Sequence, residues 1–515
     1  MKKTNSPRSR QKVTKSTVER PETPTGKPLL DMEQAIQALK TTRPTFYRWL
    51  RSGKLKGMKV GRQWRFYLED IERFLKGQGP RIDLPVGVDP LIEVLEERVR
   101  SLGEKPAQHS DDNKLARTVR LIVQFADKMR ASDIHIEPRY QDTANVRFRV
   151  DGALHAVCEI DPRLLPAVIN QWKTMASCNV HETTKPQDGR LTVDLGGTDK
   201  QIQLRACFLP TVTGESVTVR ILDRTAGLIS LDRIPFNERD REKILRWIKA
   251  PSGIVMVTGP TGCGKTSTLY AFLNQIVTPS LKVMTIEDPV EYFLAGTTQA
   301  AVNANAGVTF PSLLRSFLRS DPDVIMVAEI RDRETLNIAQ QAALTGHLLL
   351  AAIHTSEAAT ALQRMIDLTS NPFIVGDSTK LIVAQRLVRM LCPKCNVERE
   401  PTVPYLETFR KLARIGGLDP NSPPTRFREP VGCSACHMTG YRGRTIIAET
   451  LEVTPATCEA LNRHAQVAEL RSIAVREGMT TIAVDGIKRA AEGQTSLSEV
   501  MRCVGSIYTT ELASA

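Results

Sequence analysis

The sequence predicts an α/β fold for the C-terminal half of the chain, an α+β domain before it and a small helical module near the N-terminus. From Ile234 onward, apolar runs suited to buried strands alternate with helical patterns, which is typical of α/β proteins. Residues 111–230 mix helix and strand patterns without that regular alternation. At 515 residues the chain has room for three or four domains, so three folded units fit its length.

The N-terminal 80 residues contain a tail and a module. Residues 1–28 are rich in Lys, Arg, Ser, Thr and Pro, and this composition predicts a disordered basic tail. In residues 29–78, Asp31 can cap a first helix, a second helix carries Phe46 to Leu50, and Leu55 to Tyr67 alternates like two short strands. A last helix follows, so the pattern predicts a small winged helix-turn-helix.

Four prolines punctuate residues 79–110, which we interpret as a linker with a short charged helical segment. In residues 111–230 we expect a helix at Leu115–Arg130 and strands around Asn145–Val150, Gln201–Arg205 and Ser216–Leu222. The α/β domain then spans residues 231–504, with a compact cysteine-containing insertion at 392–436 and a tail at 505–515.

The net charge of +13 is concentrated at one end of the chain. Residues 1–80 hold 19 Lys and Arg against 7 Asp and Glu, a net charge of +12. A basic module on an almost neutral remainder suggests a polyanionic partner for that module. No run of 18 apolar residues occurs, so we expect a cytoplasmic protein without direct membrane insertion, which reaches a membrane only through a partner.

A glycine-rich loop follows the apolar strand Ile254–Thr258 and precedes a helical pattern. This strand–loop–helix context is what a phosphate-binding P-loop requires, because backbone N–H groups and the helix N-terminus then surround the phosphates. Lys265 would contact the β- and γ-phosphates of ATP, and the Thr266 hydroxyl would bind Mg²⁺. The predicted nucleotide-binding residues are Gly259, Pro260, Thr261, Gly262, Cys263, Gly264, Lys265, Thr266 and Ser267.

A second apolar strand, Val324–Ala328, ends in Glu329. An acid at the tip of a strand beside a P-loop can order the Mg²⁺ shell and orient or deprotonate the attacking water. On its own such a strand would be an ordinary core strand, and the P-loop makes the catalytic interpretation the stronger one.

Two Cys-x-x-Cys pairs, Cys392 with Cys395 and Cys433 with Cys436, are separated by a long segment. Four thiolates can close a tetrahedral structural Zn²⁺ site with no open position. The alternative is that the four cysteines are free buried thiols.

The segment Leu318–Asp332 resembles the signature of the type II secretion and type IV pilus assembly ATPases. Thr285–Glu291 resembles the acidic box of that family, and Thr345–His347 with His354–Thr355 resembles its histidine box. Further motifs in the expected order are Ala131–Pro138, Arg147–Gly152, Gln187–Arg190, Gly478–Met479 and Asp485–Gly486. The resemblance covers roughly residues 111–504 and implies a RecA-like ATPase domain after a PAS-like domain.

The resemblance also implies roles for individual residues. Glu291 and Glu329 would act on Mg²⁺ and the attacking water, and His347 and His354 would position the γ-phosphate region. Arginines that the family uses around the nucleotide and between subunits match Arg205, Arg220, Arg315 and Arg319. Each arginine has a surface ion pair as its alternative role.

At the level of the whole protein, the resemblance implies a homo-hexamer that powers pilus assembly or protein secretion through an inner-membrane platform protein. The cysteine insertion favours an assembly or secretion motor over a retraction motor. Small residues replace the usual ones at Cys263, Ala328, Ala352 and Ser356, which puts the turnover rate in question more than the activity.

Residues 29–78 resemble the excisionase and MerR-like helix-turn-helix domains. The resemblance implies contacts with double-stranded DNA from Arg43, Arg48, Arg51, Lys59, Arg62 and Arg65. A protein-docking role for the same basic face stays open. The second functional hypothesis is therefore a DNA-binding regulator or DNA-handling ATPase that uses the same P-loop.

Overall fold

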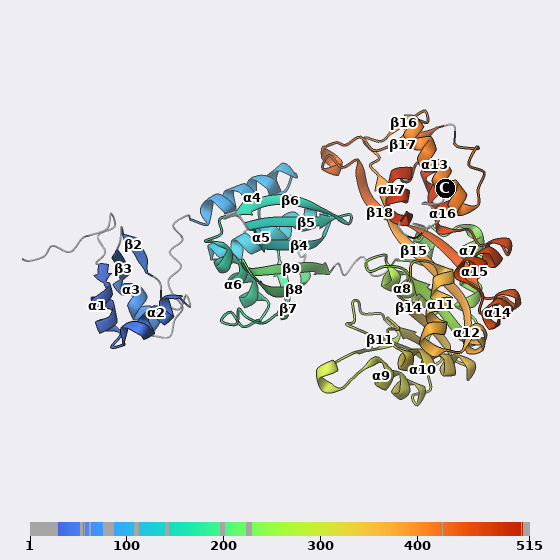
Figure 1. The fold of residues 1–515 in the computed structure, drawn as a ribbon, viewed down its shortest axis with the longest axis horizontal. Coiled ribbons are helices and arrows are strands. Elements are labelled where there is room, and N and C mark those ends of the chain that lie inside the picture. The colour runs from blue at the N-terminus through green and yellow to red at the C-terminus, as the bar shows by residue number, and fades with distance from the viewer. Residues whose placement is uncertain are drawn as a thin grey trace, which may run out of the picture.

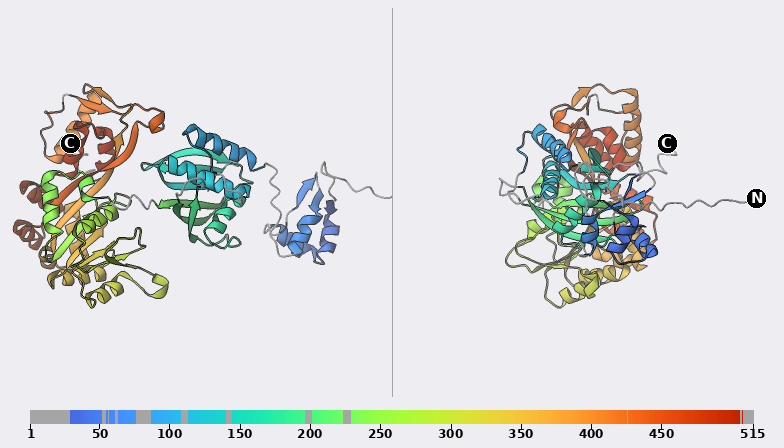
Figure 2. Two further views of the ribbon diagram at one scale, coloured as in Figure 1. Left: turned by 180° about the vertical axis from the view of Figure 1, so that it is seen from behind. Right: turned by 90° about the vertical axis from the view of Figure 1, so that its left-hand side faces the viewer.

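The computed structural model describes residues 29–51, 55, 57–60, 63–75, 87–107, 113–139, 144–195, 201–222, 229–424, 426–505 and 507. The expectation of a disordered tail at residues 1–28 lies outside the described residues, as does most of the expected C-terminal tail. Three bodies follow one another in chain order in Figure 1, and the reverse view in Figure 2 separates them in the same way.

The first body is the small module at residues 29–75. Its elements are β1 (Leu29–Asp31), α1 (Met32–Ala38), α2 (Arg43–Arg51), β2 (Met58–Val60), β3 (Gln63–Tyr67) and α3 (Leu68–Leu75). The Asp31 carboxylate caps α1 by accepting a hydrogen bond from the backbone N–H of Gln34 at 2.8 Å. Phe46 and Phe66 are fully buried and meet edge to face, with ring centroids 5.1 Å apart. The expected order of helix, turn, helix, hairpin and helix is present, and β1 adds a third strand to the hairpin.

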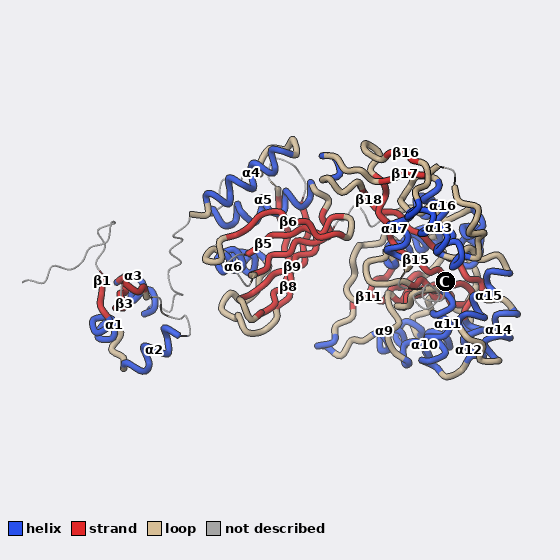
Figure 3. The backbone as a smooth tube through the Cα atoms, turned by 45° about the horizontal axis from the view of Figure 1, so that its top comes forward, coloured by secondary structure: helices blue, strands red, loops and turns tan. Residues whose placement is uncertain are grey.

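The second body is a six-stranded antiparallel sheet with three helices. The strands are β4 (Ala131–Pro138), β5 (Ala144–Val150), β6 (Ala153–Ile160), β7 (Gln187–Asp194), β8 (Gln201–Thr211) and β9 (Gly214–Leu222), in the order β6-β5-β4-β9-β8-β7. The helices are α4 (Asp89–Ser101), α5 (Lys114–Lys128) and α6 (Leu165–Met175). The tube in Figure 3 shows these strands as one continuous sheet.

Helix α4 corrects the interpretation of residues 79–110 as a linker. Leu91, Leu95 and Val99 lie on one face of this helix and are buried in the same core as α5 and the sheet. An apolar stripe at helical spacing loses its favourable burial unless it packs, so α4 is the first element of the second body. Exposed charged residues such as Glu93 and Arg98 occupy the other face of the helix, whereas Glu96 is buried and pairs with Arg117 of α5.

The third body is built on a seven-stranded sheet with the order β12-β11-β13-β14-β10-β15-β18. Its strands are β10 (Gly253–Thr258), β11 (Val283–Glu287), β12 (Thr297–Ala301), β13 (Val324–Val327), β14 (Leu348–Ile353), β15 (Thr379–Leu391) and β18 (Tyr441–Glu452). All neighbouring pairs are parallel except β15 with β18. The predicted alternation of strands and helices is confirmed.

Helices cover both faces of this sheet. One face packs against η1 (Leu231–Arg233), α7 (Glu238–Trp247) and α8 (Lys265–Ile276). The other packs against α9 (Phe310–Leu318), α10 (Arg333–Leu344), α11 (Ala358–Thr369), α12 (Pro372–Ser378), α14 (Pro455–Asn462) and α15 (Val467–Arg476). The strands of the central sheet are buried on both sides, as their continuous apolar sequences require.

The cysteine-containing insertion lies between β15 and β18. It consists of β16 (Val397–Arg399), α13 (Val403–Gly416), β17 (Phe427–Glu429) and η3 (Ser434–Cys436). Helix α13 packs with α16 (Ile482–Ala491) and α17 (Leu497–Val504) in a separate core. At Gly486 a Cβ atom would lie 2.5 Å from Val500, and the Asp485 carboxylate accepts the backbone N–H of Ala448 at 2.9 Å. This close approach explains the glycine and the acid in the closing motif.

Candidate functional site

The P-loop follows β10, a fully buried strand between β14 and β15, and leads directly into α8. Gly259, Gly262 and Gly264 all have positive φ angles, of 149°, 77° and 91°. A Cβ atom at Gly259 would lie 2.4 Å from the Cys263 sulfur and 2.5 Å from the Gln385 carbonyl oxygen. The loop therefore needs glycine at position 259 for space as well as for backbone conformation.

Lys265 opens α8, and its ammonium group lies over the loop. It donates to the carbonyl oxygens of Gly259 at 2.9 Å and Pro260 at 3.2 Å, and it lies 3.2 Å from His354 Nδ1. Burial lowers the pKa of Lys265. A bound phosphate would raise this pKa again, because its negative charge favours the ammonium form. Three neutral acceptors hold the cation where a nucleotide phosphate would lie.

The neighbouring strands β13, β14 and β10 are parallel, so their carboxyl ends lie side by side. Glu329, His354 and Lys265 follow these three ends and are brought together there. His354 Nε2 lies 2.9 Å from Glu329 Oε1, while His354 Nδ1 faces Lys265. Because the lysine ammonium can only donate, Nδ1 accepts and Nε2–H donates to the carboxylate, which describes a neutral imidazole. His354 thus joins the phosphate-binding lysine to the acid that would act on water.

The Glu329 carboxylate is also held by Arg331, whose Nε and Nη2 lie 3.0 Å from its two oxygens. Burial opposes ionisation of Glu329, but hydrogen bonds from Arg331 and His354, together with the charge of Arg331, hold its pKa below the ordinary value. The carboxylate is therefore ionised at neutral pH, as a Mg²⁺ or water ligand must be. Its backbone is fixed because Ala328 N–H donates to Ile286 and Ile330 N–H donates to Ala352.

Two residues of β15 that are not among the sequence predictions hold backbone segments near the site, one in the P-loop and one after His354. Gln385 is fully buried; its Nε2 donates to the Cys263 carbonyl at 2.8 Å and its Oε1 accepts from Thr268 at 2.9 Å. Arg386 donates to the carbonyl oxygen of Ser356 at 2.9 Å. The sequence signal was present, because this pair interrupts the apolar run from Leu381 to Val388, and buried polar side chains need partners.

The remaining loop residues lie around this centre. Thr261 is exposed, and Thr266 and Ser267 are half-buried in the first turn of α8. Ser267 lines a cavity of about 720 Å³. Other lining residues, including Asp127 and Ile221, belong to the second body, the domain of residues 89–222. The space beside the helix N-terminus is therefore bounded by both domains.

Glu291 lies apart from Glu329 and faces the second domain. It lines a cavity of about 330 Å³ together with Arg190, Arg205 and Arg220. Arg205 lies 3.7 Å from Asp188, and Arg220 lies 3.1 Å from Asp133. The structure brings the predicted acid and two of the predicted arginines to one interdomain cavity, where the guanidinium groups stay half-exposed.

Other predicted residues are placed away from the P-loop. His347 precedes β14, and its Nδ1 donates to the Ala342 carbonyl oxygen at 3.1 Å, so it lies at the opposite end of β14 from His354. The two histidines are therefore about 23 Å apart along the strand, at roughly 3.3 Å per residue. Arg315 pairs with Glu334 at 2.6 Å, and Arg319 donates to the Arg315 carbonyl at 3.0 Å. The hydrogen bonds and ion pairs described for these three residues all go to residues outside the P-loop.

The four predicted cysteines converge. Their sulfur atoms all lie within 4.8 Å of one another, and neighbouring pairs are separated by 3.7 to 3.9 Å. A tetrahedral ion with metal–sulfur bonds of about 2.3 Å requires sulfur separations of about 3.8 Å. Backbone N–H groups of Gly432 and Gly440 point at two of the sulfurs, which favours the thiolate form. The cluster therefore fits a four-thiolate metal site.

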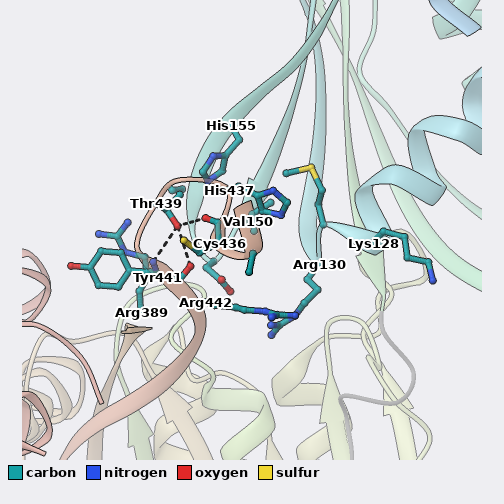
Figure 4. A pocket seen from close by; sticks show the side chains of 14 residues that line it. Lys128, Arg130, Val150, His155, Arg389, Cys436, His437, Thr439, Tyr441 and Arg442 are labelled. Carbon is teal, nitrogen blue, oxygen red and sulfur yellow. Dashed lines mark hydrogen bonds between the residues drawn. The ribbon is translucent and has the colours of Figure 1, made fainter. Parts of the chain in front are cut away.

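The cysteine insertion also touches the second domain. Figure 4 shows Cys436, His437 and Arg442 across a small pocket from Arg130 and His155. At the rim of this pocket the Asp151 carboxylate accepts the backbone N–H of Gly443 at 2.8 Å, and Arg444 lies 3.8 Å from it. The turn that carries Asp151 thus forms a contact between the two domains.

In the N-terminal module the structure describes two of the six predicted DNA-contacting side chains. Arg43 lies 3.7 Å from Glu33, and Arg65 donates to Gln63 at 2.8 Å. The side chains of Arg48, Arg51, Lys59 and Arg62 lie outside the described residues. Among the described residues, no helix of any domain has the length and apolar composition needed to cross a bilayer.

Family models match two segments of the chain. The model for "Type II/IV secretion system protein" matches residues 108–502, and that for "Helix-turn-helix domain" matches residues 29–79. The second match confirms the helix-turn-helix that the sequence predicts.

Curated relatives carry two kinds of name. A type IV pilus assembly ATPase PilB of Myxococcus xanthus is 39% identical over 436 residues, which are 84% of this chain and 75% of the relative. Type II secretion system protein E of Pseudomonas aeruginosa is 40% identical over 395 residues, 77% of this chain and 76% of the relative. The predicted resemblance is confirmed at this level, since both named groups match.

Among solved structures, the Legionella pneumophila ATPase DotB superposes with a TM-score of 0.55 at 19% identity, covering 78% of this chain and 98% of that one. The pilus retraction motor PilT gives 0.50 at 22% identity, covering 75% and 96%. At this identity the likeness concerns the fold, which agrees with the predicted α/β P-loop domain preceded by an α+β domain. The chain belongs to the Type II/IV secretion system protein family.

Proposed function

We propose that this chain is an ATP-hydrolysing motor that powers type IV pilus assembly or type II protein secretion at the bacterial inner membrane. The observation that supports it most strongly is the contact series from Lys265 through His354 to Glu329 on a P-loop. Lysine would bind the transferred phosphoryl group, Thr266 would hold Mg²⁺, and Glu329 would orient the attacking water. The names of the relatives supply the process that the hydrolysis drives.

The contacts of Lys265 and His354 suggest how nucleotide binding would reorganise the site. A γ-phosphate entering beside Lys265 would compete for the lysine with the Gly259 and Pro260 carbonyl oxygens and His354. Once Nδ1 takes up a proton from solvent, His354 would donate to the phosphate from Nδ1 while Nε2–H keeps its contact with Glu329. When the phosphate replaces these acceptors of Lys265, nucleotide binding would be coupled to the position of Glu329 through His354.

Arg205 and Arg220 would close on the nucleotide from the second domain, opposite Glu291 of the α/β domain. Positive charge brought to a transferring phosphoryl group stabilises its transition state, and the cavity between these residues leaves room for that approach. For Arg315, Arg319 and His347 we propose roles at the interface between subunits of a homo-hexamer, because their described partners lie outside the P-loop of their own chain. The motion of the two domains would be passed to an inner-membrane platform protein.

For the four-cysteine cluster we propose a structural Zn²⁺ ion held by Cys392, Cys395, Cys433 and Cys436. The sulfur separations match a tetrahedral site, and four thiolates leave no position for water. Zinc would supply cross-linking of the insertion and no step of hydrolysis.

Phosphate release by purified protein tests the motor. Wild type should hydrolyse ATP with Mg²⁺, while Lys265→Ala and Glu329→Gln should lose activity by about a hundredfold or more because each removes transition-state stabilisation. In cells, gene deletion complemented with Lys265→Ala should restore neither surface fibres nor secreted proteins. Absence of ATP hydrolysis by the wild type, together with full complementation by Lys265→Ala, contradicts the proposal.

A second function, double-stranded DNA binding, is favoured by the helix-turn-helix match and by the charge of +12 on residues 1–80. Full-length protein should bind a labelled duplex with an affinity that falls steeply with salt, because phosphate contacts release counterions. Arg43→Glu with Arg65→Glu should weaken binding, whereas Arg476→Glu, an exposed arginine on α15, should not. Salt-independent binding or none would leave protein docking as the role of this module.

A further inference from the structure

The histidine loop, residues 354–357, joins β14 to α11. Each of its residues after His354 is held by a different element. Thr355 Oγ1 lies 2.8 Å from Thr258 Oγ1, the last residue of β10, and its N–H donates to the same oxygen at 3.0 Å. The Ser356 carbonyl accepts from Arg386 of β15 at 2.9 Å. Two of the supports therefore come from the strands that also support the P-loop.

The third support comes from the C-terminal helices. Arg471 of α15 binds both carboxylate oxygens of Glu357, with Nε–Oε2 and Nη2–Oε1 distances of 3.0 Å each. The side chains of this pair are 17% and 4% exposed, so it is well shielded from water. A bidentate Arg–carboxylate pair fixes orientation as well as distance. The end of the histidine loop thus has its position set by a helix more than a hundred residues further along the chain.

The fourth support is Glu449 of β18, which is 1% exposed. One of its oxygens accepts the N–H of Ala358 at 2.8 Å, and the other accepts the N–H of Ile482 at 3.0 Å. These are the first residues of α11 and α16, so a single carboxylate caps two helices. The N-termini of α11 and α16 are therefore held together by one side chain.

The charges in this cluster depend on one another. Burial, and then the negative charge of the neighbouring Glu357, raise the pKa of Glu449 to about 7, while Arg471 acts in the opposite direction. Without the arginine, two buried carboxylates would repel each other directly behind the loop. Arg471 is thus the residue on which the geometry of the whole cluster depends.

We propose that Glu357, Glu449 and Arg471 are positioning residues that hold His354 against the terminal phosphate of ATP. They touch no reacting atom and act only through the position of His354. The affinity for ATP therefore depends on the positions of α15 and α16. The inference rests on the ATPase function proposed above. ADP lacks the terminal phosphate, and its binding therefore does not depend on this loop.

Full-length Arg471→Gln tests the proposal, with binding of ADP and of a non-hydrolysable ATP analogue measured separately. We expect the preference for the ATP analogue over ADP to fall about tenfold, and kcat/KM for ATP to fall about 10- to 100-fold, as a displacement of about 1 Å predicts. The Kd for ADP should change less than about twofold. The matched control is Arg502→Gln, which breaks the 2.6 Å pair with buried Glu499 on α17 and should leave the preference unchanged.

A second variant separates positioning from stability. Glu357→Gln with Arg471→Met removes both charges, so the thermal stability lost in the single variant should largely return. The ATP preference should stay low, because the bidentate contact is still missing. Recovery of the preference together with stability, or equal weakening of both nucleotides in Arg471→Gln, overturns the inference. Failure of the wild type to bind ATP would instead contradict the proposed function itself.

Discussion

Replacing Gln385 with leucine tests whether β15 supports the P-loop. The change keeps the side-chain volume but leaves the Cys263 carbonyl and the Thr268 hydroxyl without their partner in a fully buried position. Each buried polar group left without a partner lowers the free energy of unfolding by about 1–3 kcal/mol. Burial of the apolar leucine offsets part of this, so we expect the free energy of unfolding to fall by about 2–4 kcal/mol. For a domain of this size the melting temperature should fall by roughly 5–15 °C.

The same change should weaken ATP binding by roughly tenfold, because about 1.4 kcal/mol of loop ordering would have to be supplied by the nucleotide. The assays are thermal unfolding of the full chain and equilibrium binding of an ATP analogue. Gln340→Leu is the matched control: Gln340 is 1% exposed on α10, and its Nε2 has no hydrogen-bond partner within the described part of the chain. If Gln385→Leu melts and binds like wild type and like Gln340→Leu, the reasoning about β15 is wrong.

Two further predictions concern the metal cluster and the buried carboxylate. Purified protein should contain about one zinc per chain; Cys433→Ser should lose it and expose the amides of residues 392–440 to hydrogen exchange, whereas Cys458→Ser, outside the cluster, should retain both. Metal-free wild type with full amide protection would count against the zinc site. The pKa of Glu449 is raised to about 7, so its contribution to stability is complete below pH 4.5 and is lost as pH rises through 7. The melting temperature of wild type should decline across that window by an amount worth roughly 3 kcal/mol, and Glu449→Gln should show a flatter profile; identical profiles would refute the assignment.

The features that the sequence predicted well are those whose parts lie close together along the chain. Residues 259–266 form the P-loop as one contiguous stretch, so strand, glycines, lysine and helix could be identified without knowledge of the rest of the fold. Each Cys-x-x-Cys hook is local in the same sense. The helix-turn-helix order followed from the cap at Asp31 and from apolar spacing.

Helix α4 shows where local composition misleads. Prolines and charges suggested a linker, but Leu91, Leu95 and Val99 complete a core whose other side is formed by later strands. Whether an apolar stripe is buried depends on a partner surface that the segment itself does not contain. Gln385 was overlooked for a similar reason, since its two partners lie more than a hundred residues before it.

The sequence by itself determined that the chain carries a P-loop, an acidic residue at the end of a neighbouring strand and two Cys-x-x-Cys pairs. Only the tertiary structure decided which of the two histidines in the histidine box reaches that P-loop. His347 and His354 stand at opposite ends of β14, and the parallel pairing of β14 with β10 and β13 places His354 beside Lys265 and Glu329. Spacing along the chain is set by covalent geometry, whereas the edge at which strand ends meet depends on strand order and direction, which arise from packing across the whole sheet.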